Sequence, residues 1–391
     1  MELYILNNIE SDNVVKSLMS GQPYKAMNDV IRFAETSGVT DNSVKEYVIS
    51  LIANDENIVS SLAGAGKKIG DDLKTALTHD ISVIFGDLIT LCTESYKPSG
   101  NPIGFYEDYK DSIKMLTETD DINAFTDLLI EHYHKFGTGV LAKYIAYKYE
   151  DGLIGIENTD GITFSALVGL EYQKEILIGN TLDFVEGKMA NNVLLFGDRG
   201  TGKSSSVKAL LNMFYEEGLR VVEMPKKHLC ALPSLVNYLS DKPHKYIIFL
   251  DDLSFETSDP DYKALKVAMD GQLEARPKNV LIYATSNRRH LIKETWADRE
   301  GGEVHKNDNM QETLSLSERF GISLVFSAPT QKEYLNIVSE LLKAKNIAMN
   351  AEIERKAIVW QMNYSGRSGR CASQFVASYL AKKSEKSEQN K

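Results

Sequence analysis

The stretch from Leu194 to Ser205 constrains what this chain can fold into more than any other. It reads LLFGDRGTGKSS, so that an apolar run enters a glycine-rich loop and a helical pattern leaves it. Glycines at the first, fourth and sixth loop positions let the backbone turn tightly and approach an anion without a Cβ in the way. This order of strand, loop and helix is typical of a phosphate-binding P-loop.

Each part of this loop has an expected role. Its amide groups would point inward, and the positive end of the following helix would add to their field. Lys203 would meet the β- and γ-phosphates of a nucleotide, and the Ser204 hydroxyl would ligate Mg²⁺. The residues expected to bind the nucleotide are Gly197, Asp198, Arg199, Gly200, Thr201, Gly202, Lys203, Ser204 and Ser205. The alternative, a chance glycine turn beside a lysine, does not explain the ordered context.

Length and composition indicate an ordinary globular protein of two or three domains. The chain has 391 residues, of which 43% are hydrophobic and 25% charged, and single cores rarely grow past about 250–300 residues. The net charge of −11 argues against a protein built mainly to hold nucleic acid, although a local basic face could still bind it.

The cysteines and the start of the chain favour a cytoplasmic protein. Cys92, Cys230 and Cys371 lie far apart and form no CxxC pair, which indicates reduced thiols and neither a disulfide framework nor a metal site. The first residues lack a basic region followed by an apolar core. The most apolar stretch, 81–92, is too short to span a bilayer. We therefore expect a cytoplasmic location and no membrane partner.

Residues 1–150 are predicted to form an all-α N-terminal domain. Apolar residues recur at steps of three and four over 73–91 and 122–133, and less cleanly over 141–148. The region contains no chemical constellation, and its histidines are expected to pack in the interior or lie at the surface. The segment 151–163, rich in glycine and acid, is predicted to be a linker.

Residues 164–328 are predicted to form an α/β domain around a mostly parallel sheet. Predicted strands are 192–196, 219–224, 246–250, 279–284 and 322–326, and predicted helices are 170–184, 205–217, 232–239 and 262–274. The third strand is apolar throughout, as in a parallel strand buried on both faces. Asp251 and Asp252 follow it, at the edge where open α/β sheets bind ligands. We interpret this as a Walker B element, with Asp251 at Mg²⁺ and Asp252 next to the γ-phosphate; the alternative is an acidic turn.

The rest of the chain carries two further polar signals. The fourth strand ends in Thr-Ser-Asn, where the amide of Asn287 could orient an attacking water. A charged segment, 293–312, is predicted to be a surface loop. Residues 329–384 are predicted to form a helical lid, with Arg370 in the first turn of its last helix. Residues 385–391 are alternately charged and predicted to be a disordered tail.

These elements in this order resemble the AAA+ ATPases over roughly residues 160–384. Within that superfamily, several stretches resemble a bacterial family catalogued only as domain of unknown function 815. They are VGLEYQK at 168–174, GDRGTGKSS at 197–205, LSLSERFG at 314–321 and SGRSGR at 365–370. The resemblance implies an α/β P-loop NTPase of AAA+ type, with a C-terminal helical lid, that binds ATP and Mg²⁺.

The resemblance also implies roles for single side chains. The catalytic set would be Lys203, Asp251, Asp252, Asn287, Arg319 and Arg370, and the metal would be held by Ser204 and Asp251. Asn287 would be the first sensor of the γ-phosphate and Arg370 the second. Arg319 resembles the arginine finger, which in AAA+ assemblies reaches the nucleotide of a neighbouring subunit. The segment 168–173 would lie near the adenine.

Two assignments stay open. Most AAA+ enzymes have Glu where this chain has Asp252, and the shorter side chain needs a closer water, so Glu256 is a second candidate to position it. Arg288 and Arg289 are alternatives to Arg319 as the finger, and Arg319 could instead be a salt-bridged surface arginine.

Three functions are compatible with these residues. The first is an ATPase that self-associates as a ring or dimer, with Arg319 acting in trans, and that remodels a macromolecular partner. The second is an ATP-gated binding module with little turnover, which the aspartate at 252 leaves open. The third is a small-molecule kinase, which explains neither Arg319 nor the arginine of the lid.

Overall fold

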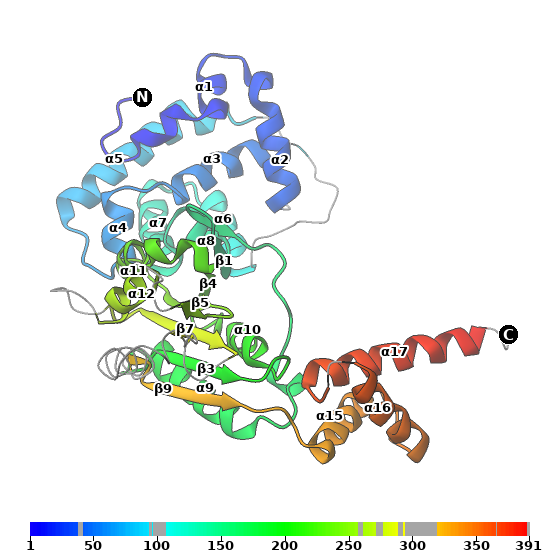
Figure 1. Cartoon of the computed structure of the whole chain (residues 1–391). Helices are drawn as coiled ribbons and strands as arrows, with labels where there is room; N and C mark the ends of the chain where they lie inside the picture. Colours follow the sequence, from blue (N-terminus) through cyan, green and yellow to red (C-terminus); the bar gives the residue numbers. More distant parts are fainter. Residues whose placement is uncertain are drawn as a thin grey trace. The chain divides into compact units, whose positions relative to one another are not determined.

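The computed structural model describes residues 1–37, 42–93, 96, 107–256, 261–270, 277–287, 292–293, 319–364 and 366–388. The chain divides into two compact units, one of residues 1–159 and 237–244 and the other of residues 160–236 and 245–391 (Figure 1). Every helix in the described ranges is too short or too polar to cross a bilayer.

The first unit is built mainly of short helices. They are α1 (Asn13–Met19), α2 (Met27–Ser37), α3 (Ser43–Ala53), α4 (Ile58–Gly64), α5 (Asp71–Asp87), α6 (Glu107–Glu118), α7 (Ile122–Phe136) and α8 (Gly139–Lys143), with 3-10 turns η1 (Asn7–Ser11), η2 (Pro23–Ala26) and η3 (Ile89–Leu91). Apolar residues at helical spacing meet in one core, where Leu77, Phe125 and Leu129 have no exposed surface. Since α5 and α7 bury the predicted stripes, the prediction of a helical N-terminal region is confirmed.

The last part of this unit is a pair of strands. Strand β1 (Ala146–Tyr149) pairs antiparallel with β2 (Leu153–Gly155). The helix predicted over residues 141–148 is therefore wrong beyond Lys143, where α8 ends. Tyr147 is fully buried, and aromatic residues fit a half-buried pleated surface better than a helix. Strand β2 lies inside the segment that was predicted to be a linker.

A buried histidine makes the stability of the first unit sensitive to acid. His132 on α7 is 1% exposed, and its Nδ1 lies 2.8 Å from Ser112 Oγ. Burial lowers the pKa of His132 from the ordinary 6.5 to about 3. Below pH 6.5 the unfolded chain therefore binds a proton that the folded protein does not. The stability is intact above that pH and is lost as the pH falls toward 3.

We expect the free energy of local unfolding around α7 to fall by about 1.4 kcal/mol per pH unit below about pH 6. Hydrogen exchange of the α7 amides at pH 7 and pH 5, corrected for the intrinsic exchange rate, measures this slope. In His132→Phe the slope should shrink, whatever the change in absolute stability. An unchanged slope would assign the acid sensitivity to other groups.

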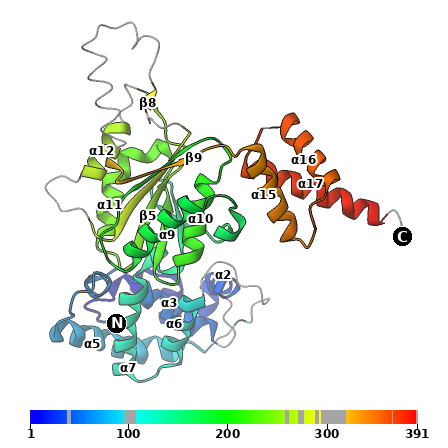
Figure 2. The same ribbon diagram turned by 90° about the horizontal axis from the view of Figure 1, so that it is seen from below.

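Among the described residues, five parallel strands form the sheet of the second unit. They are β3 (Val193–Gly197), β4 (Leu219–Glu223), β5 (Lys245–Leu250), β7 (Val280–Ser286) and β9 (Ile322–Phe326), in the order β4-β5-β7-β3-β9. The helices of this α/β region are α9 (Glu171–Val185), α10 (Lys203–Phe214), α11 (Leu232–Ser240) and α12 (Asp261–Asp270), with 3-10 turns η4 (Phe164–Ala166) and η5 (Lys226–Ala231). Figure 2 shows α9 and α10 on one side of the sheet and α12 on the other. Strand β7 is buried along its whole length, as expected for a sheet covered on both faces.

The strand order decides which loops meet. Strand β7 lies between β3 and β5, although it follows both of them in the sequence. Because all three strands are parallel, their carboxyl ends share one edge of the sheet, with the tip of β7 in the middle. The polar end of β7 thus lies between the glycine-rich loop after β3 and the acidic pair after β5.

A three-helix bundle follows the sheet. Its helices are α15 (Gln331–Lys343), α16 (Ala351–Asn363) and α17 (Gly369–Glu388), and a short parallel pair, β6 (Phe255–Glu256) with β8 (Ile292–Lys293), lies outside the main sheet. Thr330 and Glu333 form a capping box at the start of α15. Helix α17 continues to Glu388, past residue 384 where the lid was predicted to end. Most of the loop predicted at 293–312 lies outside the described residues.

Candidate functional site

The glycine-rich loop has a backbone that requires its glycines. Gly197, Gly200 and Gly202 have φ of +132°, +74° and +102°, in the region that L-residues with side chains rarely adopt. Space is also limiting, because a Cβ on Gly197 would lie 2.2 Å from the Phe326 carbonyl oxygen. A Cβ on Gly200 would lie 3.0 Å from Ser368 Oγ. The loop is therefore held against both the last strand of the sheet and the last helix of the lid.

The loop encloses the ammonium group of Lys203. The side chain is 7% exposed, and Nζ donates to the carbonyl oxygens of Gly197 (2.9 Å) and Asp198 (2.6 Å) and to Asn287 Oδ1 (3.3 Å). Burial lowers the pKa of Lys203, against the nearby carboxylates, which raise it. Within the described residues, the amides of residues 200–205 donate to no acceptor. Buried positive charge and unpaired N–H groups fit an anion such as a phosphate.

The acidic pair is tied to the tip of β7. Ser204 Oγ donates to Asp251 Oδ1 over 2.7 Å, and Thr285 Oγ1 donates to the same oxygen over 2.5 Å. The Asp252 amide donates to Thr285 Oγ1 over 2.8 Å. Asp252 has a left-handed backbone, with φ of +51°, and this hydrogen bond helps to hold that uncommon conformation. The predicted metal ligands, Ser204 and Asp251, are thus already in contact.

Asn287 joins the two halves of the site. Its Oδ1 accepts from Lys203, and its Nδ2 donates to Asp252 Oδ1. One amide therefore connects the lysine of the glycine-rich loop to the second acid after β5, as its position at the tip of the intervening strand requires.

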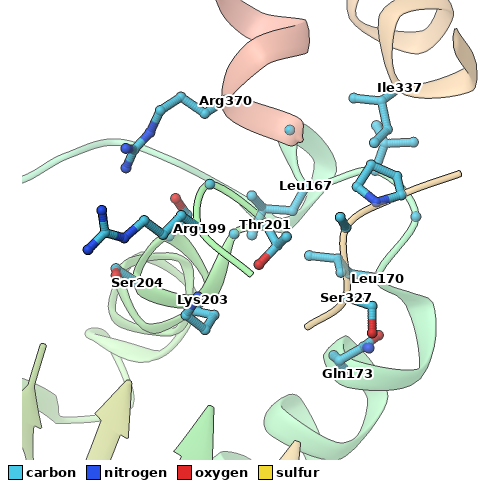
Figure 3. Close-up of a pocket in the computed structure, with 18 of the residues that line it drawn as sticks. Leu167, Leu170, Gln173, Arg199, Thr201, Lys203, Ser204, Ser327, Ile337 and Arg370 are labelled. Carbon is cyan, nitrogen blue, oxygen red and sulfur yellow. The ribbon is translucent and has the colours of Figure 1, made fainter. Parts of the chain in front are cut away.

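These residues line a cavity of about 880 Å³ that is charged at one end and apolar at the other (Figure 3). The charged end contains Arg199, Lys203, Ser204, Asp251, Asp252, Asn287 and Arg370. The apolar end contains Leu167, Leu170 and Ile337, and Ile162, Val168 and Leu341 also line the cavity. This volume is within the range of small-molecule sites, and the polarity matches a molecule with a phosphate end and a flat, less polar end.

The structure separates the predicted site residues into two groups. Thr201, Gly202 and Ser205 line the cavity with the charged residues named above, whereas Gly197 and Asp198 do not. Asp198 Oδ2 instead accepts from the amide of Ala328 over 2.7 Å, on the connection between β9 and the lid. The side chains of Glu256, Arg288 and Arg289 lie outside the described residues. Arg319 is half-buried and does not line the cavity.

Sequence reasoning missed two parts of the site. Thr285 was noticed only as part of a polar strand end, yet its hydroxyl touches both Asp251 and Asp252. Ile337 and Leu341 of α15 lie in the predicted lid, where they were given no role, and they line the cavity. The sequence of a lid helix could not show which of its apolar residues would face a ligand.

The donor set fits a magnesium ion only in part. Among the described residues, no three His, Cys, Asp or Glu side chains come together as a metal site. Ser204 and Asp251 supply two oxygen ligands, and Mg²⁺ usually takes one or two protein ligands with phosphate oxygens and waters. The residues therefore fit Mg²⁺ together with a nucleotide, and not Mg²⁺ alone.

The strand order, the glycine-rich loop, the acidic pair and the helical lid define a P-loop fold of AAA+ type, as predicted. A family model described as "Protein of unknown function (DUF815)" matches residues 142–383, and the protein belongs to this family. The search of curated proteins found no match.

Solved structures of low identity resemble the chain. One is a point variant of RuvB from Thermotoga maritima, with 16% identity, a TM-score of 0.36, and coverage of 54% of this chain and 61% of that one. Another is the Orc1 protein of Aeropyrum pernix in complex with DNA, with 17% identity, a TM-score of 0.38, and coverage of 58% and 66%. At TM-scores this low the class assignment rests on the strand order and the site.

Proposed function

We propose that this protein binds ATP with Mg²⁺ and hydrolyses it, and that hydrolysis drives the remodelling of a macromolecular partner. The observation that supports this most strongly is the joining of Lys203, Asn287 and Asp252 by hydrogen bonds at the charged end of the cavity. A lysine for phosphate, an amide and a carboxylate are the groups that an attack of water on a terminal phosphate needs.

The chemistry would depend on position and charge. Bound Mg²⁺ would neutralise charge on the phosphate oxygens. The loop amides and Lys203 would hold the phosphates in line, and Asn287 and Asp252 would orient the attacking water. Little covalent chemistry is required of the protein, because charge stabilisation in a preorganised site is enough for phosphoryl transfer.

Asp252 is the better supported of the two carboxylates considered for the water. Its carboxylate accepts from Asn287 and it lines the cavity.

Arg319 is proposed to act on the site of a neighbouring subunit. It lines no part of the cavity in its own chain, while Arg370 of the lid does. The position of Arg319 supports a site that is completed between copies of the chain, as in a dimer or a ring, whereas Arg370 would act within its own chain.

The first unit is proposed to recognise a protein partner. Residues 1–159 contain 25 Asp and Glu but only 13 Lys and Arg, a net charge of −12, whereas the whole chain has a net charge of −11, so all of the net negative charge lies there. Such a field repels nucleic acid and favours a basic protein surface.

The test is steady-state ATP hydrolysis by the full chain and by Asp252→Asn. We expect turnover to fall at least about a hundredfold while ATP binding is retained, since this variant removes the charge that orients the water. Asp111→Asn, an exposed change in the first unit, is the matched control.

Other outcomes are equally clear. Full turnover in Asp252→Asn would indicate that Glu256, and not Asp252, orients the attacking water. A wild-type protein that binds ATP tightly and does not turn it over would favour the ATP-gated binding module. A wild-type protein that binds no nucleotide would overturn the proposed function altogether.

A further inference from the structure

Arg199 is a loop residue that was expected to bind the nucleotide, without a contact assigned to its side chain. It is exposed, and it lies between Asp198, which is turned to the lid connection, and Gly200. No carboxylate in the described part of the chain forms an ion pair with it, although it lines the cavity. An arginine held at a cavity wall without a protein partner is placed to meet an anion.

A second arginine lies directly beside it. The Arg370 amide donates to the Gly200 carbonyl oxygen over 3.1 Å. A Cβ on Gly200 would lie 3.2 Å from the Arg370 Cβ, so the start of α17 touches the loop next to Arg199. Figure 3 shows the guanidinium groups of Arg199 and Arg370 on the same side of the loop, the side on which Ser204 lies.

Three positive groups therefore face one end of the cavity. The Lys203 ammonium is enclosed by the loop, where two backbone carbonyl oxygens and Asn287 Oδ1 accept its hydrogen bonds. Like charges brought together repel one another unless an anion lies between them. The carboxylates of Asp251 and Asp252 lie at the same end and would be balanced by Mg²⁺, so the three cations are complementary to a ligand with more than one negative charge there.

The direction of the chain of phosphates follows from the two ends of the cavity. The flat part of a nucleotide fits the apolar end at Leu167, Leu170 and Ile337. The loop amides and Lys203 then hold the middle of the phosphate chain. Arg199 and Arg370 would then contact the phosphate at the far end of that chain.

We propose that Arg199 binds the terminal phosphate of ATP together with Arg370, so that each chain distinguishes ATP from ADP with two arginines of its own. This inference rests on the proposed function and adds a specificity-determining residue to it. Both guanidinium groups can donate two parallel hydrogen bonds to phosphate oxygens.

The test is calorimetric titration of the full chain with the β,γ-imido analogue of ATP and with ADP, both with Mg²⁺. In Arg199→Ala we expect the affinity for the ATP analogue to fall about tenfold to a hundredfold, the effect of losing charge-assisted hydrogen bonds. The affinity for ADP should change less than about threefold. Arg199→Lys should recover part of the loss, because it keeps the charge without the planar fork.

Arg355→Ala is the matched control, since Arg355 is an exposed arginine of α16 that does not line the cavity. Equal losses for both nucleotides in Arg199→Ala, or no loss for either, would overturn the assignment of Arg199 to the terminal phosphate. Failure of the wild-type protein to bind either nucleotide would instead overturn the proposed function, so the two failures are distinguishable.

Discussion

Mixing two inactive variants, Arg319→Ala and Lys203→Ala, is expected to restore ATP hydrolysis. Arg319→Ala alone should lose at least about a thousandfold in turnover, because an arginine finger contributes about 10³–10⁵ in rate. In the mixture, a subunit with an intact loop can receive the arginine of its neighbour. About a quarter of the sites then work, since one subunit in two has the lysine and one neighbour in two has the arginine.

The measurement is specific activity against the mixing ratio, at a protein concentration at which the chain is self-associated. Arg355→Ala mixed with Lys203→Ala is the control, since it should show only the activity of its own intact sites. Mixtures that stay as inactive as either variant would mean that Arg319 acts within its own chain or has a structural role. The same mixture with Arg288→Ala or Arg289→Ala tests the two alternative fingers.

Dilution provides an independent measure of the same effect. Turnover per chain should fall as the protein is diluted through its dissociation range, because a lone subunit lacks the arginine of its neighbour. Constant specific activity in a demonstrated monomer would contradict a shared site.

Lys203→Ala is expected to abolish hydrolysis and to weaken ATP binding at least about a hundredfold, since the lysine would contact two phosphates by charge-assisted hydrogen bonds. The fold itself should survive. Burial lowers the pKa of Lys203, so the desolvation of its charge opposes folding and offsets part of the three hydrogen bonds that the substitution removes, and the melting temperature of the free protein should fall little.

Thermal unfolding with and without ATP and Mg²⁺ separates these effects. The wild-type protein should be stabilised by the nucleotide, and Lys203→Ala should show no such shift. Lys208→Ala is the control, because Lys208 lies on the same helix, where its Nζ is 3.1 Å from Asp160 Oδ2. A ligand-induced shift of normal size in Lys203→Ala would contradict a phosphate contact for Lys203.

Local patterns in the sequence were enough to predict most of the helices and strands of the second unit. The strands at 193–197, 245–250 and 280–286 are apolar runs that only a sheet covered on both faces can bury. The loop positions with positive φ require glycine, because residues with a side chain rarely adopt that conformation. The capping box at Thr330 also follows from two residues three positions apart. These features depend on neighbours in sequence, so a sequence without a structure already contains them.

Long-range pairing decided what local patterns could not. Residues 146–149 have a weak helical spacing, yet they form a strand. They do so because they pair with β2 and because Tyr147 is buried in that arrangement. A helical prediction failed there because β-structure depends on its partner more than on its own propensity.

The sequence by itself determined that this chain has a P-loop, an acidic strand end and a helical lid, and hence the class of fold. Only the tertiary structure placed the tip of β7 between the P-loop and the acidic strand end. There Thr285 forms hydrogen bonds with both Asp251 and Asp252, and Asn287 joins Lys203 to Asp252. It also brought the start of α17 against Gly200 and so set Arg370 beside Arg199. The physical reason is that motifs are read along the chain, whereas strand order and lid packing are set by burial between distant segments.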